Sequence, residues 1–384
     1  MVAKSKKLLL ACSLCFISNL ATVSASDGQS EFEKKKAEAL SSFSETKEQR
    51  NQEFEQSKQA YLIAFNNVKA ELATKWDNPE LTGETQWVQY TNNDTVKRTV
   101  DFETGTIVIE VIDENLTSGE VDKIIQQQIN ELETQTTKQA FANDKVLAAN
   151  NIKPSQKIAD IRVLPKLESS QVLSSQKKEY YKQRNGLSVT RVSMAVSQNT
   201  VKDRAQAYIP YVNKMSQKWD VEPALILAIM HTESHFNPMA QSHIPAYGLM
   251  QVVPTSAGKD VTKRYLGEEK LLPPEVLFNP EFNIDIGTSY LNILDKHYLK
   301  GIQNDEKRTY LVISSYNGGV GSVAKYFSGS TSLEALRKAV HDINADEVYR
   351  SLIDDFPYLE TREYLKKVQE KRIYYSKWLR SNYS

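Results

Sequence analysis

Two histidines and a glutamate lie close together in the segment LAIMHTESHFNP, Leu227 to Pro238. His231 and His235 are four residues apart, so they share one face of a helix and could hold a metal ion. Glu233 lies two residues from each histidine, and at about 100° per residue it turns roughly 200° away from their shared face. A metal held by the two histidines would therefore not meet this carboxylate.

A zinc site would also need a third protein ligand. The remaining histidines, His243, His297 and His341, stand in no cluster with ligand spacing. The sequence therefore predicts no metal, and it predicts that His231 and His235 are polar residues near a helix end.

The helix that carries Glu233 is expected from Pro223 to His235. Its PALILAIM run has too little polarity to face water on any side, so we expect a central core helix. Asp220 is the candidate N-cap, and Pro223 is tolerated in the first turn. At the other end, the helix dipole and burial both disfavour a negative charge and raise the pKa of Glu233, as a general acid requires. The alternative is a glutamate that emerges at the surface where the helix stops.

Three later segments supply polar and aromatic side chains. YGLMQVVP places Gly248 beside Gln251, whose amide has both a donor and an acceptor for sugar hydroxyls and amides. SSYNGGVGSV ends a helix with Tyr316 and Asn317 ahead of glycines; it lacks the buried strand and the G-K-[ST] of a phosphate-binding loop. FPYLETREYLKKV begins a helix at Thr361 and carries Tyr364. Each segment alone is more often structural than functional.

The composition is that of a soluble globular protein with room for two domains. The chain has 384 residues, of which 40% are hydrophobic and 25% are charged. Its 48 basic and 48 acidic residues balance, so no overall field attracts nucleic acid, and we assign no nucleic-acid role.

The N-terminus has the pattern of a secretory signal peptide. Lysines at positions 4, 6 and 7 precede the apolar run from Leu8 to Val23, and small residues follow it. We expect cleavage after Ala25, which places the mature protein in the periplasm. Cys12 and Cys15 both lie in this signal, so the mature chain would have no disulfide. A lipid anchor on Cys12 is the alternative, but the apolar stretch before it is short.

The remaining chain divides into two unlike parts, and the fold class is α+β. Residues 26–195 are expected to form an accessory α+β domain, with helices over 31–76 and after Val121 and a small antiparallel sheet. Its strands are predicted at Trp87–Tyr90, Val96–Phe102, Thr106–Val111 and Leu187–Val196. Residues 196–384 are expected to form a mainly α-helical domain, with helices at Ala205–Trp219, Pro223–His235, Ile284–Tyr298, Lys307–Tyr316 and Thr361–Leu379.

Together the motifs resemble those of the soluble lytic transglycosylases, enzymes of bacterial cell-wall metabolism with a lysozyme-like catalytic domain. They stand here, in the family's order, as ESHFNP from Glu233, GLMQ from Gly248, SYNGG from Ser315 and ETREY from Glu360. Ser315 replaces the usual alanine. The first half, with KWDNPELTGETQWVQY and VDFETGTIVIEVI, looks like that of the membrane-bound lytic murein transglycosylase C type, whose members carry a lipid anchor.

The resemblance implies that Glu233 is the single catalytic acid and base, and that the C6 hydroxyl of N-acetylmuramic acid attacks its own C1 to leave a 1,6-anhydro end. It also implies that the reaction uses no cofactor. It implies that the residues binding the glycan are Ser242, Gln251, Tyr316, Asn317 and Tyr364. The expected partners are peptidoglycan strands, with outer-membrane association and other cell-wall enzymes as further partners. The competing functions are a lysozyme-type hydrolase, which would favour a second carboxylate such as Asp260 or Glu360, and a wall-binding protein without activity.

Overall fold

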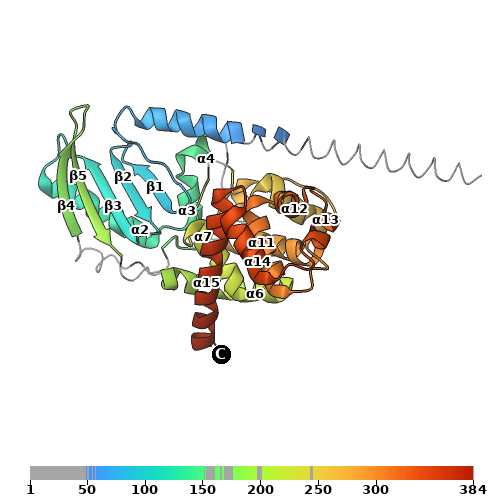
Figure 1. Ribbon diagram of the computed structural model, residues 1–384. Helices are drawn as coiled ribbons and strands as arrows, with labels where there is room; N and C mark the ends of the chain where they lie inside the picture. The colour runs from blue at the N-terminus through green and yellow to red at the C-terminus, as the bar shows by residue number, and fades with distance from the viewer. Residues whose placement is uncertain are drawn as a thin grey trace, which may run out of the picture. The chain divides into compact units, whose positions relative to one another are not determined.

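The computed structural model describes residues 49, 52–53, 55–56, 58–150, 152, 161–164, 167, 176–196, 201–242 and 245–383. The predicted signal peptide, both cysteines and His243 lie outside the described residues. Glu53–Ser384 groups into one compact unit, shown with its strands and helices in Figure 1. Among the helices of the described ranges, none is both long and apolar enough to cross a membrane.

A five-stranded antiparallel sheet forms the first part of this unit (Figure 1). Its strands are β1 (Gln86–Thr91), β2 (Val96–Asp101), β3 (Thr106–Ile112), β4 (Gln176–Lys182) and β5 (Ser188–Ala195), in the order β1-β2-β3-β5-β4. Asn92, Asn93 and Asp94 all adopt positive φ between β1 and β2, which these residue types tolerate. The four predicted strands are confirmed. β4 was not predicted, because QKKEYYK is an exposed, lysine-rich edge without alternating hydrophobicity.

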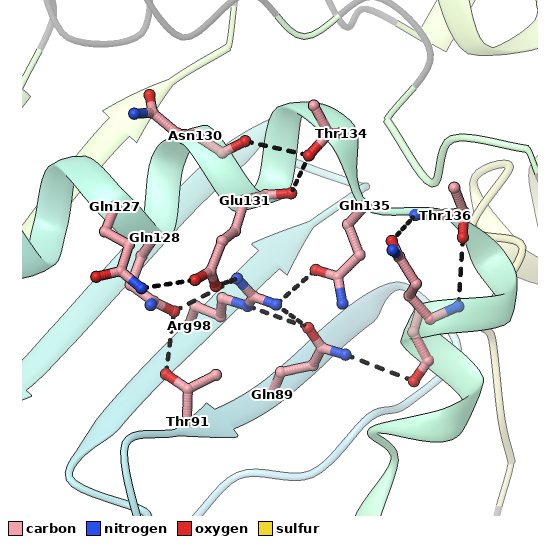
Figure 2. A network of polar contacts seen from close by, with 12 residues as sticks. Gln89, Thr91, Arg98, Gln127, Gln128, Asn130, Glu131, Thr134, Gln135 and Thr136 are labelled. Carbon is pink, nitrogen blue, oxygen red and sulfur yellow. Dashed lines mark hydrogen bonds and ion pairs between the residues drawn. The ribbon is translucent and has the colours of Figure 1, made fainter.

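One face of the sheet packs on helix α2 (Ser118–Thr134), which begins with a capping box formed by Thr117 and Glu120. Figure 2 shows the polar contacts between them. The guanidinium of Arg98 in β2 is buried and donates hydrogen bonds to Gln89 of β1, to Glu131 of α2 and to the residue that follows α2. Burial lowers the pKa of Arg98 to about 10, against the raising effect of Glu131. A fully partnered network of this kind fixes the helix on the sheet.

Shorter helices complete this half. The first described helix covers 58–72, and its buried Tyr61, Val68 and Leu72 pack with Val146. α3 (Thr137–Ala142) and α4 (Lys145–Ala149) follow α2. The helix predicted over 31–76 is therefore confirmed at its described positions up to residue 72, and residues 73–75 form a turn.

The second half is helical. Its elements are α6 (Val201–Trp219), α7 (Pro223–Ser234), η2 (Pro254–Gly258), α8 (Lys259–Leu266), α9 (Pro274–Leu277), α10 (Pro280–Asn292), η3 (Ile293–Tyr298), α11 (Asp305–Gly318), α12 (Val320–Ser328), α13 (Leu333–Ala339), α14 (Ala345–Arg350), η4 (Ser351–Asp355) and α15 (Leu359–Tyr383), where η marks a π-helical turn. The predicted helices and the α+β class are confirmed. The division into domains 26–195 and 196–384 stays a prediction.

Helix α7 is in contact with α6 and α15, and Figure 1 shows it beside α15. Every residue from Ala224 to Met230 is buried, as the PALILAIM run predicted. The predicted cap is wrong. Asp220 has a φ of 52° and pairs with Lys296 at 3.0 Å, and the N-cap position is Glu222, which makes no side-chain cap. Pro223 leaves fewer N–H groups in the first turn for a cap to satisfy.

Candidate active site around Glu233

Glu233 lies in the last turn of α7, where the chain changes direction sharply. The helix ends at Ser234 because His235 and Phe236 both adopt left-handed backbone conformations, with φ of 49° and 63°. Consecutive left-handed residues other than glycine are costly and gather at functional sites. The side chain of Ser234 donates to the carbonyls of Met230 and Leu249, at 3.0 and 2.8 Å. The end of α7 is thus tied to the GLMQ segment.

The carboxyl group of Glu233 has one hydrogen-bond partner among the described residues. The hydroxyl of Tyr364, in α15, donates to Glu233 Oε1 at 2.6 Å. Burial raises the pKa of Glu233 to about 8, the bond from Tyr364 opposes this, and the charges of Glu84 and Glu360 raise it further. At neutral pH the group is therefore protonated and can donate a proton.

Tyr316, near the end of α11, also lies close to Glu233. Its hydroxyl donates to the carbonyl of Met250 at 2.8 Å, and its ring lies 5.6 Å from that of Tyr290. Burial first, and then the charge of Glu233, raises the pKa of both Tyr316 and Tyr364 well above the ordinary value. Both tyrosines therefore stay protonated and act as hydrogen-bond donors.

Asn317 is held between α11 and α15. Its amide nitrogen donates to Glu360 Oε1 at 3.0 Å, and its carbonyl oxygen accepts from the Thr361 hydroxyl at 2.6 Å. The next residue, Gly318, permits this close approach, because a Cβ there would lie 2.8 Å from the same hydroxyl. The SYNGG and ETREY motifs therefore meet at one place.

Gln251 lies in a tight turn that uses up its donor. Its φ is 44°, and its Nε2 donates to the carbonyls of Ala240 and Gly248, at 3.2 and 3.0 Å. Its Oε1 has no partner among the described residues. Both a donor and an acceptor were expected of Gln251 for a ligand; in this structure its N–H groups bond within the protein and its carbonyl oxygen is buried.

Asn283, in α10, was missed by the sequence analysis although it holds this turn. Its Oδ1 accepts from the Met250 N–H at 2.8 Å, and its Nδ2 donates to the carbonyls of Tyr247 and Leu277, at 2.7 and 2.8 Å. Gly248 packs on the same side chain, since a Cβ at Gly248 would lie 2.6 Å from Asn283 Nδ2. The only signal in the sequence was an asparagine in a helix that is otherwise largely apolar.

Ser242, the last predicted binding residue, lies on the loop that leaves α7. It is partly buried, and its N–H donates to the carbonyl of Ala246 at 3.2 Å. Residues 243–244, which follow it, lie outside the described residues.

Glu84 approaches the site from the first half of the chain, just before β1. The carbonyl of Glu84 accepts from Asn237 Nδ2, and the carbonyl of Gly83 accepts from the Gln241 N–H, both at 3.2 Å. Asn237 and Gln241 belong to the loop that follows Glu233. No local pattern in the sequence could have shown this long-range contact.

The two histidines contact each other and an aromatic cluster. Their rings lie 5.0 Å apart, and His231 Nδ1 shares a hydrogen bond of 3.0 Å with the Tyr375 hydroxyl. Burial, followed by the charge of Lys371, lowers the pKa of His231 to about 3 and that of His235 to about 4. Both rings are therefore neutral at pH 7. Within the described ranges, no three His, Cys, Asp or Glu residues gather as a set of metal ligands.

Comparison with known proteins agrees with the motifs. The family model described as Transglycosylase SLT domain matches residues 210–337. The membrane-bound lytic murein transglycosylase C of Pectobacterium atrosepticum is 33% identical over 336 residues, which cover 85% of this chain and 92% of the relative. The chain belongs to this family. The same enzyme of Yersinia pestis is 34% identical over 355 residues and covers 85% of this chain and 93% of its own.

A solved structure of a soluble lytic transglycosylase is similar to a smaller share of the chain. The 70-kDa soluble lytic transglycosylase of Escherichia coli is 26% identical, covers 47% of this chain and 26% of its own, and gives a TM-score of 0.37.

The predicted site residues of this family member fall into two groups. Tyr364 bonds to Glu233 directly, and Tyr316 lies within reach of its charge. Asn317 is linked to Glu233 through Glu360, whose charge also acts on it. Gln251 and Ser242 lie on the segments that follow α7, and their assignment to the substrate stays a prediction.

Proposed function

We propose that this chain is a peptidoglycan lytic transglycosylase in which Glu233 carries out both proton transfers. The enzyme would cleave the β-1,4 bond between N-acetylmuramic acid and N-acetylglucosamine without water. The observation that carries this role is the state of Glu233, a carboxyl with a pKa of about 8 and one donor, Tyr364, fixed on its Oε1. A group with this pKa is protonated when substrate arrives and can ionise during the reaction.

In the first step, protonated Glu233 donates its proton to the glycosidic oxygen. The bond from C1 of the muramoyl residue to that oxygen breaks, and N-acetylglucosamine leaves with a free hydroxyl. The new carboxylate is stabilised by the Tyr364 hydroxyl at 2.6 Å, since charge-assisted hydrogen bonds are stronger than neutral ones.

In the second step, the C6 hydroxyl of the same muramoyl residue attacks C1. Glu233 accepts the hydroxyl proton and returns to its starting state. The product is a 1,6-anhydromuramoyl end, and no water is consumed. An attacking group in the same sugar ring has a high effective concentration, up to about 10⁵–10⁸ M in well-oriented cases.

A lysozyme-type hydrolase is the second candidate, because hydrolysis uses two carboxylates at the scissile bond. Glu84 and Glu360 are the carboxylates whose charges reach Glu233. Glu360 already accepts a hydrogen bond from Asn317 at 3.0 Å, which fits a role in positioning α15 better than the activation of water. These two charges instead raise the pKa of Glu233.

The remaining site residues would bind the glycan. Gln251, whose Oε1 is buried without a protein partner in the described ranges, would reach a sugar hydroxyl or an acetamido N–H after a rotation of its side chain. Tyr316, Asn317 and Ser242 would line the same surface, as their match to family positions suggests.

Membership of the family places the chain in the cell envelope, where its peptidoglycan substrate lies. Within the envelope we propose a periplasmic location after removal of residues 1–25. Attachment to the outer membrane and contacts with other cell-wall enzymes through the first half are further proposals. Intact-mass measurement of protein from the envelope fraction tests the location, since a diacylglyceryl group on Cys12 would contradict cleavage after Ala25.

The role of Glu233 is tested by Glu233→Gln. The amide has nearly the same shape but cannot transfer a proton. Turnover of purified sacculi should therefore fall by at least roughly 10²–10⁴-fold, the typical contribution of general acid–base assistance. The melting temperature at acidic pH should be unchanged. Near-normal turnover by a folded variant would move the chemistry to another residue.

A further inference from the structure

A cavity of about 720 Å³ lies on the sheet face opposite α2. This volume is in the range of about 300–1,000 Å³ that small-molecule sites occupy. Its walls come from β1, β2, β3, the β4–β5 hairpin and the segment that follows the first helix. Side chains in strands alternate between faces, so Lys97, Thr99 and Asp101 face this cavity while Arg98 faces α2. The chemistry assigned to Glu233 does not use it.

The floor of the cavity is a buried ion pair. Lys97 and Glu110 lie directly opposite each other in β2 and β3, with Lys97 Nζ 2.6 Å from Glu110 Oε2. Both side chains are less than a tenth exposed. The Tyr181 hydroxyl donates to Glu110 Oε1 at 2.9 Å, and Glu80 accepts from Lys97 at 3.0 Å. Charges buried this deeply must be fully partnered to be tolerated, and these are.

The other acidic groups of the cavity are also occupied. Asp101 accepts hydrogen bonds from the N–H groups of Glu103 and Thr104, at 2.9 and 2.8 Å, and from Gln86 at 3.0 Å. Asp77 accepts from the Arg184 N–H at 2.5 Å. A ligand therefore finds few unoccupied carboxylate oxygens.

Several basic side chains of the cavity, in contrast, have no hydrogen-bond or ion-pair partner in the described ranges. Arg191, in β5, lies between Glu110 of β3 and Glu179 of β4 in the strand register. Its guanidinium nevertheless forms no hydrogen bond or ion pair with any residue in the described ranges, and Glu179 pairs with Lys177 instead. The side chains of Lys182 and Arg184 are likewise exposed, line the cavity and have no such partner within those ranges. The unused binding capacity is thus cationic.

We propose that this cavity binds the carboxylate-bearing peptide stems of peptidoglycan, with Arg191 and Arg184 holding the carboxylates. This rests on the proposed function, which makes peptidoglycan the substrate. An arginine can bind a carboxylate through two parallel hydrogen bonds. The site would select strands that still carry peptides and would retain the enzyme on them.

The bare glycan fits this cavity less well than a peptide. A sugar ring stacks on an exposed aromatic face, and Trp76 offers none, since it is 1% exposed and its ring lies under the ammonium of Lys97. Tyr181 also lines the cavity and is 40% exposed, so the preference for the peptide comes from charge. Peptide-free glycan carries one carboxylate on the lactyl group of each muramoyl residue, held close to the sugar ring. A peptide stem carries more than one carboxylate on a flexible chain, so it can reach both arginines.

The test is isothermal titration calorimetry, in which each probe is titrated into the full chain. The probes are a free stem tetrapeptide, peptide-free glycan strands and vesicles that contain an anionic phospholipid. We expect the tetrapeptide to bind to one site. Arg191→Ala and Arg184→Ala should each raise its Kd roughly tenfold or more, the factor expected for a lost charge-assisted hydrogen bond. The matched control is Lys123→Ala, an exposed cation on α2 at the other face of the sheet, which should leave the Kd unchanged.

Three results would overturn the proposal: no tetrapeptide binding at millimolar concentration, an unchanged Kd in both arginine variants, or binding of vesicles alone. Both arginines are exposed, so the variants should fold and melt at the same temperature as the natural chain. The charge-preserving Arg191→Lys should retain part of the affinity for the tetrapeptide. Cleavage of peptide-free glycan by the same preparations separates the two proposals. Cleavage without peptide binding contradicts only the peptide site, and peptide binding without any cleavage contradicts only the proposed function.

Discussion

Among single residues, the proposed reaction depends most on Glu233, whose carboxyl group is protonated near neutral pH. Burial is the main cause of the raised pKa of Glu233, and three neighbours adjust it in opposite directions. Tyr364 stabilises the carboxylate, whereas Glu84 and Glu360 destabilise it. The same neighbours therefore set both the acid that starts the reaction and the base that completes it.

The pH dependence of turnover should follow this pKa. Because protonated Glu233 is the active acid, kcat/KM should be level below about pH 8 and fall roughly tenfold per pH unit above it. Tyr364→Phe removes a bond that favours the carboxylate, so the basic limb should move up by roughly one pKa unit. Glu360→Gln removes a like charge, so the limb should move down. The pH profiles of both variants are measured on soluble glycan fragments. If the basic limb moves in the same direction in both, a group other than Glu233 controls it.

The free energy of unfolding should also depend on pH through the pKa of Glu233. The folded chain disfavours ionised Glu233, whose pKa is raised from 4.5 to about 8. Its contribution to the free energy of unfolding is therefore full below pH 4.5 and is lost as the pH rises through 8. Glu233→Gln has no such loss, so its melting temperature should exceed that of the natural chain by a growing margin between about pH 5 and pH 9. A constant difference across this range would mean that Glu233 has an ordinary pKa.

At the scale of elements, the site is built where α7, the turn after it, α11 and α15 meet. The turn is fixed by Asn283, which bonds to three backbone groups, and by Gly248, whose φ of 73° suits glycine. Gln251 belongs to the same turn, since its Nε2 donates to the carbonyl of Gly248 at 3.0 Å.

Gly248→Ala should therefore destabilise the protein through two effects. A left-handed alanine costs about 1–2 kcal/mol, and the new Cβ would lie 2.6 Å from both Asn283 Nδ2 and the Leu277 carbonyl. The matched control is Gly267→Ala, with a φ of 75° and no atom within 4 Å of the added Cβ. Denaturant unfolding should show a loss for Gly248→Ala that exceeds the control by more than about 1 kcal/mol. Equal losses would mean that Asn283 moves aside.

At the scale of the whole molecule, local patterns predicted most elements but few of the contacts between them. PALILAIM predicted α7, and alternating residues predicted four strands. β4 escaped because its QKKEYYK segment is an exposed edge, and Asp220 failed as a cap because the turn before Pro223 gives it a positive φ. The helix position made Glu233 a candidate, and the family motifs selected it. Glu84 and Asn283 could not, since they reach the site only through long-range packing.

The central claim is that the muramoyl C6 hydroxyl, and not water, completes the reaction begun by Glu233. The most direct measurement is mass spectrometry of muropeptides after digestion of purified sacculi, with borohydride reduction to mark reducing ends. The account predicts that most muramoyl products resist reduction and are lighter by one water than their hydrolysed equivalents, and that Glu233→Gln yields neither kind. Predominantly reducible muramoyl ends would contradict it and make this protein a lysozyme-type hydrolase.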